Sequence, residues 1–153
     1  MSRIASAYII TPDLIDTASR LASAGDEAGF RHELDDSELD PGYPYDGYVL
    51  AVVIAYLNEH GASLPSDPAD PRAAAIVAQL SPVICVELAE AAVCLKAIRS
   101  ISPRVEDLRT YFEEFTEAQW PEAGQAMQEG LSFFISALTL QQLTGGWLVV
   151  FIG

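Results

Sequence analysis

Basic residues are scarce in this chain of 153 residues. It carries eight Lys and Arg against 22 Asp and Glu, which gives a formal net charge of -14 at pH 7. Such a charge repels DNA, RNA and anionic lipid surfaces, so the sequence predicts no nucleic-acid partner and no membrane partner. A basic protein is the kind of partner that this charge favours.

Cysteine is scarce as well, and no secretory signal is evident. Cys85 and Cys94 fall in a segment that we predict to be one helix, where they lie about 13.5 Å apart along the axis and cannot form a disulfide. The apolar stretch near the N-terminus reaches Thr11-Pro12-Asp13 before it attains the length of a signal peptide. We therefore expect a cytoplasmic protein with reduced thiols.

The segment LSFFISALTLQQLTGGWLVVFIG, residues 131–153, contains no charge at all. A membrane-spanning helix needs about 20 consecutive apolar residues, but Gln141, Gln142, Gly145 and Gly146 interrupt this run at its middle, and no Lys or Arg flanks it. The apolar spacing before the glycines predicts a helix that ends there. The run after them predicts a central strand buried on both faces.

The remaining pattern predicts a single α+β domain over residues 1–153. Half of the residues are hydrophobic, which is enough for one core. An N-terminal strand over residues 4–10 is expected to lie beside the C-terminal strand in a small mixed β-sheet, packed by several α-helices. Helices are expected from Thr11-Pro12-Asp13, Asp46, Asp70-Pro71, Ser81-Pro82, Ser102-Pro103 and a Thr116/Gln119 capping box. The mean hydropathy of +0.21 predicts apolar surface, which a homo-oligomer would cover.

The chain resembles a known family in the order and spacing of these elements. It is similar to the bacterial YfbM-like family, a domain of unknown function, in RIASAYIITPDLI, DGYVLAVVIAYLNEHG, VICVELAEAAVCLKAI, RVEDLRTYFEEF, the Trp-Pro pair before the last helix, and GGWLVVFIG. The resemblance covers most of the chain. It implies an α+β domain with helices packed on a small sheet, and it implies no established activity.

The densest polar segment is DDSELDPGYPYDGY, residues 35–48. A calcium-binding loop counted from Asp36 would need glycine where Pro41 stands and glutamate where Gly47 stands, so that template fails. We predict a partner-binding loop, in which carboxylates attract a basic partner and tyrosines supply contact area. Its residues are Asp35, Asp36, Glu38, Asp40, Tyr43, Tyr45 and Tyr48. A merely solvated acidic loop is the simpler alternative.

Catalytic and metal-binding patterns are not found in the sequence. The two histidines, His32 and His60, lack neighbours at metal-ligand spacing, and neither a G-x-S-x-G nor a G-x-G-x-x-G motif occurs. We predict no metal, no cofactor and no catalytic residue, and we favour a non-enzymatic binding module, for example an immunity-type inhibitor of a basic toxin. The alternative is a small metal-independent enzyme whose site combines the 35–48 loop with His60 and Trp120.

Overall fold

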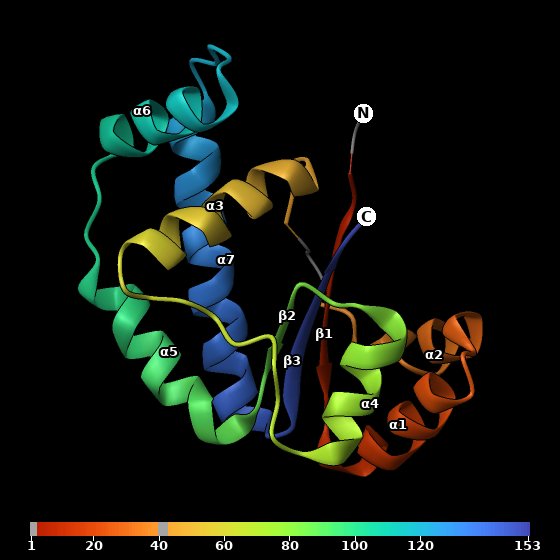
Figure 1. Ribbon diagram of the computed structural model, residues 1–153. Coiled ribbons are helices and arrows are strands. Elements are labelled where there is room, and N and C mark those ends of the chain that lie inside the picture. Colours follow the sequence, from red (N-terminus) through yellow and green to blue (C-terminus); the bar gives the residue numbers. More distant parts are fainter. Residues whose placement is uncertain (1–2, 40–42) are drawn as a thin grey trace.

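The computed structural model describes residues 3–39 and 43–153. Figure 1 shows its secondary-structure elements, and the N- and C-terminal strands run side by side. In chain order the elements are β1 (Ala5–Ile10), the 3-10 turn η1 (Pro12–Leu14), α1 (Ile15–Ser23), α2 (Glu27–Glu33), the 3-10 turn η2 (Asp35–Ser37), α3 (Gly47–Glu59), α4 (Pro71–Leu80), β2 (Ile84–Val86), α5 (Leu88–Ser100), α6 (Val105–Thr116), α7 (Ala123–Thr144) and β3 (Trp147–Ile152).

The three strands form one sheet in the order β1-β3-β2. The α+β class and the pairing of the terminal strands are confirmed, and β3 is the central strand, as its apolar sequence predicts. Both pairings are antiparallel, with Tyr8 opposite Val149 and Cys85 opposite Val149. The described sheet is therefore antiparallel and not mixed, and β1 lies at its edge.

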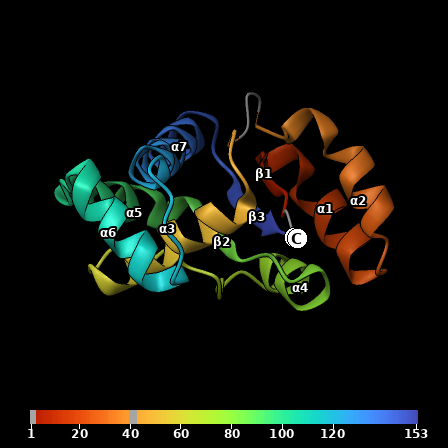
Figure 2. The same cartoon turned by 90° about the horizontal axis from the view of Figure 1, so that it is seen from above.

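Helices cover both faces of the sheet, so the domain has two hydrophobic cores (Figure 2). Alternate strand residues point to opposite faces. One set, which includes Ile9, Leu148 and Val150, packs with α3, α5, α6 and α7. The other set, which includes Ile10 and Val149, packs with α1, α2 and α4. Burial on both faces explains why β3 contains no polar residue.

Helix α7 is the element on which α3, α5 and α6 pack (Figure 1). Gly130 lets α3 approach closely, because a Cβ at this position would lie 2.9 Å from a methyl group of Val53. The uncharged tail is thus the second half of α7, a glycine turn and β3, as predicted. Within the described ranges, no helix is both long and apolar enough to span a membrane.

The predicted helix from Ser81-Pro82 is wrong at its start and correct from Leu88 onward. Ser81 ends α4 with a left-handed φ of 52°, and Ile84–Val86 form strand β2 before α5 begins at Leu88. Hydrogen bonding to β3 and complete burial decide the conformation of this short apolar segment. Consequently Cys85 lies in β2 and Cys94 in α5, and both thiols are free and buried.

One further local prediction fails, and one helix was not predicted. The predicted capping box is absent, because the Thr116 hydroxyl donates to the Phe112 carbonyl at the end of α6, and α7 begins only at Ala123. The charged stretch after Gly25 contains a helix that we did not predict, α2. Its N-cap is Asp26, whose carboxylate accepts a hydrogen bond from the Gly29 amide at 2.8 Å.

Candidate functional site

The predicted 35–48 loop is divided in the structure into two parts with different surroundings. Residues 35–37 form η2, and the next two residues run along the open edge of β1. The Leu39 amide donates to the Ala7 carbonyl at 2.9 Å, and Glu38 forms an isolated bridge with Tyr8. Asp40 lies outside the described residues, so the structure gives no account of it.

Asp35, Asp36 and Glu38, which we call the acidic segment, are exposed. Every ion pair in the described part of the chain uses one of Arg31, Arg72, Arg104 and Arg109, and none of these pairs involves the acidic segment. These three carboxylates are therefore not neutralised by a described cation. Their backbone is ordered, with Asp35 and Asp36 in η2 and Glu38 bridged to β1.

A shallow groove of about 320 Å³ borders the acidic segment. Asp36 and Glu38 line it on one side, and Leu140 and Thr144 of α7 line it on the other. Leu140 is 40% exposed, so part of the groove wall is apolar. The groove thus combines negative charge with an accessible hydrophobic contact.

The tyrosines of the predicted loop lie elsewhere. Tyr43 is a core residue, only 8% exposed, and its hydroxyl donates to the Ala126 carbonyl at 2.9 Å. Burial raises the pKa of Tyr43, with a smaller contribution from Tyr45. The Tyr43 ring packs beside Gly130 and its hydroxyl reaches Ala126, whereas the groove contacts Leu140, so about 15–20 Å of α7 separates the two regions. Tyr43 is therefore not available as partner contact area, which corrects that part of the prediction.

The other two tyrosines also make internal contacts. Tyr45 is half-buried. Its ring centroid lies 5.6 Å from that of Tyr43 and 6.2 Å from that of Trp120. Tyr48 is 38% exposed, and the Arg3 guanidinium lies 5.9 Å from its ring centroid. Of the three tyrosines, Tyr48 presents the most surface, but it does not line the groove beside the acidic segment.

The residues of the alternative enzyme site are only partly gathered. Trp120 contacts Tyr45, which immediately precedes the N-terminal end of α3. His60 caps the C-terminal end of the same helix, about 20 Å away along its axis. Among residues 3–39 and 43–153, no group of three His, Cys, Asp or Glu side chains is placed to hold a metal ion.

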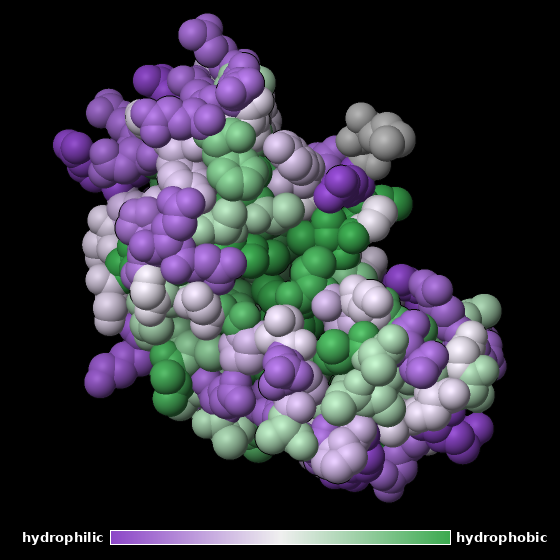
Figure 3. Space-filling view, in the orientation of Figure 1, coloured by the Kyte–Doolittle hydropathy of each residue, from purple (hydrophilic) through white to green (hydrophobic). Residues whose placement is uncertain are grey.

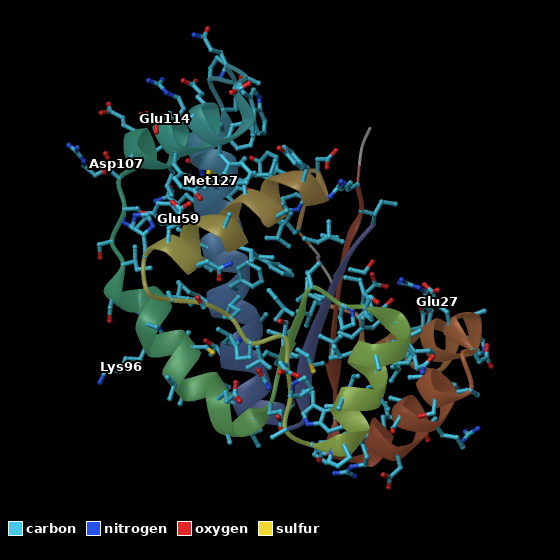
Figure 4. The ribbon with its side chains drawn as sticks, viewed as in Figure 1. Glu27, Glu59, Lys96, Asp107, Glu114 and Met127 are labelled. Carbon is cyan, nitrogen blue, oxygen red and sulfur yellow. The ribbon has the colours of Figure 1, made fainter. Side chains whose placement is uncertain are left out.

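A pocket that the sequence did not predict lies between α3 and α6. Its volume is about 370 Å³, and we call it the aromatic pocket; it is lined by Tyr56, His60, Asp107, Thr110, Tyr111 and Glu114. The His60 and Tyr56 rings are stacked with centroids 3.9 Å apart, and Tyr111 meets Tyr56 edge to face at 5.1 Å. Figure 4 shows Glu59, Asp107 and Glu114 at this corner of the molecule.

Part of this pocket was visible in the sequence. Tyr56 and His60 are four residues apart on α3, as are Tyr111 and Phe115 on α6, and such pairs lie on one helix face. The contact between the two pairs depends on how α3 packs on α6, which no local pattern specifies.

The face of the molecule shown in Figure 3 separates polar from apolar surface. Hydrophilic side chains cover α6, and hydrophobic side chains gather in a hollow between α3 and α4. Exposed apolar surface of this kind is typical of protein contacts. The homo-oligomer suggested by the mean hydropathy stays a prediction.

No family model, curated protein or solved structure matches this chain. The resemblance to the YfbM-like family therefore stays a prediction.

Proposed function

We propose that this domain is a non-enzymatic binding module that recognises a basic protein partner through the acidic segment. The observation that carries the proposal is the arrangement of Asp35, Asp36 and Glu38: three exposed carboxylates without a described ion pair, beside a groove with an apolar wall. An immunity-type inhibitor that covers a basic toxin is one concrete form of such a module.

Two physical arguments support this proposal. First, the backbone of the acidic segment is already ordered, because Asp35 and Asp36 lie in η2 and Glu38 bridges to β1, so less conformational entropy is lost on binding than with a free acidic loop. Second, the overall charge of -14 attracts a basic partner over long range and raises its association rate. The groove residue Leu140 then supplies the short-range hydrophobic contact.

The proposal is tested by comparing two triple variants that change the net charge equally. One carries Asp35→Asn, Asp36→Asn and Glu38→Gln. The control carries the substitutions Glu106→Gln, Glu117→Gln and Glu122→Gln, which alter exposed acids that make no described ion pair.

The native domain and the two triple variants are each immobilised. A basic protein that the native domain retains from an extract of the source cells is purified, and its direct binding to each of the three immobilised proteins is measured. The proposal predicts that the control, which loses the same charge, binds only slightly more weakly than the native domain and that the first variant binds at least about tenfold more weakly. Equal binding by both variants would refute a role for the acidic segment, since only bulk charge would then matter.

A further inference from the structure

We infer that the aromatic pocket between α3 and α6 binds an organic cation, an ammonium or guanidinium group on a short apolar stem. The pocket combines the two features that such a group recognises. The exposed His60 ring and the half-buried Tyr111 ring offer aromatic surface to a cation and its apolar stem, while the Tyr56 ring is covered by His60. Asp107 and Glu114 line the same space, and their carboxylates accept hydrogen bonds from the cationic head.

Burial and nearby carboxylates both act on the phenols of this pocket. Burial, and then the charge of Glu59, raise the pKa of Tyr111 to about 12. Burial, and then the charge of Asp107, also raise the pKa of Tyr56. Both hydroxyls are therefore neutral at physiological pH, and the acids that surround them remain as the source of attraction for a cation.

In the described residues, one hydrogen-bond acceptor of the pocket, on the His60 ring, also remains for a ligand. His60 Nδ1 lies 2.7 Å from the Tyr56 carbonyl oxygen, which can only accept, so Nδ1 carries the proton in the neutral ring. Nε2 of the neutral ring is then an acceptor for a ligand N–H. Tyr111 Oη is buried and interacts with the Glu59 carboxylate, so the Tyr111 contribution to binding is its ring and not its hydroxyl.

The acids of the pocket are not equivalent. Asp107 is paired with Arg104 at 3.2 Å, whereas none of the described ion pairs uses Glu114. Glu114 is exposed at the rim of the pocket and is the carboxylate that a ligand can engage without displacing an arginine.

The pocket is an open depression with a volume of about 370 Å³, which limits the ligand to a small group. It lies at the small end of the range for ligand pockets, about 300–1,000 Å³. It suits one alkyl-ammonium or alkyl-guanidinium group. That group belongs either to a small-molecule cation or to a Lys or Arg side chain of a protein, and the cationic group is the same in both. The inference does not depend on the acidic segment, whose residues lie outside this pocket.

The test is a titration of the native domain followed by NMR of its aromatic ring protons. The probes are n-butylguanidinium, the neutral and similarly shaped n-butylurea, and N-acetyl-arginine methylamide. We expect saturable shifts at Tyr56, His60 and Tyr111 with n-butylguanidinium in the millimolar range, and no saturation with n-butylurea. Comparable binding of the blocked arginine would indicate a protein side chain as the source, and binding of n-butylguanidinium alone would indicate a small-molecule cation.

Variants separate binding from structure. Glu114→Gln should weaken n-butylguanidinium binding about threefold, whereas Glu106→Gln, on the same helix but outside the pocket, should change it by much less. Tyr111→Phe keeps the ring and should retain binding, whereas Tyr111→Leu should lose it. Thermal melting establishes that each variant is folded.

Three results would overturn the inference. They are shifts that do not saturate, equal responses to n-butylguanidinium and n-butylurea, and equal effects of Glu114→Gln and Glu106→Gln. The first two would mean that the rings form a structural cluster only, and the third would mean that the cation senses net charge and not this pocket.

Discussion

The turn between α7 and β3 provides the sharpest test of the fold. Gly146 has a φ of +85, and a Cβ added there would overlap the carbonyl oxygen of Ile10, the last residue of β1. Because that oxygen belongs to the backbone, it cannot move away as a flexible side chain would. Gly146→Ala must therefore displace the turn or separate the ends of β1 and β3.

Gly61→Ala is the matched control. Gly61 has a φ of +75, but a Cβ added there would meet no heavy atom within 4 Å. Gly61→Ala therefore measures the backbone effect alone. A left-handed alanine costs about 1–2 kcal/mol and the stiffer unfolded chain offsets part of this, so the expected loss of stability is about 1 kcal/mol. Gly146→Ala adds an overpacking cost of about 1–3 kcal/mol. We expect a total loss of about 3 kcal/mol.

Thermal and urea unfolding of the two variants measure this difference. For a chain of this size about 1 kcal/mol corresponds to about 2–4 °C. We expect Tm to fall by about 2–4 °C for Gly61→Ala and by about 6–12 °C for Gly146→Ala. If the two variants lose the same stability, the close approach of the turn to β1 is wrong.

Three further predictions concern buried and charged groups. Gln141→Leu removes two hydrogen bonds to buried carbonyls and should cost about 1–2 kcal/mol in urea unfolding; an unchanged midpoint would contradict this. Burial raises the pKa of Cys85 to about 12, so at pH 8 a disulfide reagent should label it only after unfolding, and rapid labelling of the folded protein would refute its burial. Hydrogen bonds from the side chain and backbone of Arg72 hold the pKa of Asp70 below its ordinary value. Its stabilisation is therefore present above about pH 4 and is lost as the pH falls through the lower folded-state pKa. Asp70→Asn should flatten the loss of stability between about pH 4 and pH 2, and an equally steep loss would contradict the assignment.

The sequence predicted those parts of the fold where local pattern and burial agree. The uncharged tail has a glycine pair between a helical period and a uniformly apolar run, and the structure turns from α7 to β3 there. Strand β2 was missed because Ile84–Val86 is too short to show a period. Only its pairing with β3, more than 60 residues later, makes it a strand.

The candidate site was predicted less well, for a related reason. Closeness in sequence suggested that the acids at 35–38 and the tyrosines at 43–48 form one surface. Long-range contacts separate them, since Leu39 pairs with β1 while Tyr43 enters the core against α7. The aromatic pocket shows the converse, because Tyr56 and Tyr111 are distant in sequence and meet only through helix packing.

Association kinetics at two salt concentrations test the proposed function most directly. Exposed charges attract over long range and are screened by salt, with a Debye length of about 30 Å at 0.01 M and about 8 Å at 0.15 M ionic strength. The account predicts that the native domain binds its basic partner at least about tenfold faster than the Asp35→Asn, Asp36→Asn, Glu38→Gln variant at the lower salt, and that this ratio shrinks at the higher salt. Identical association rates of the two proteins at both salt concentrations would contradict it.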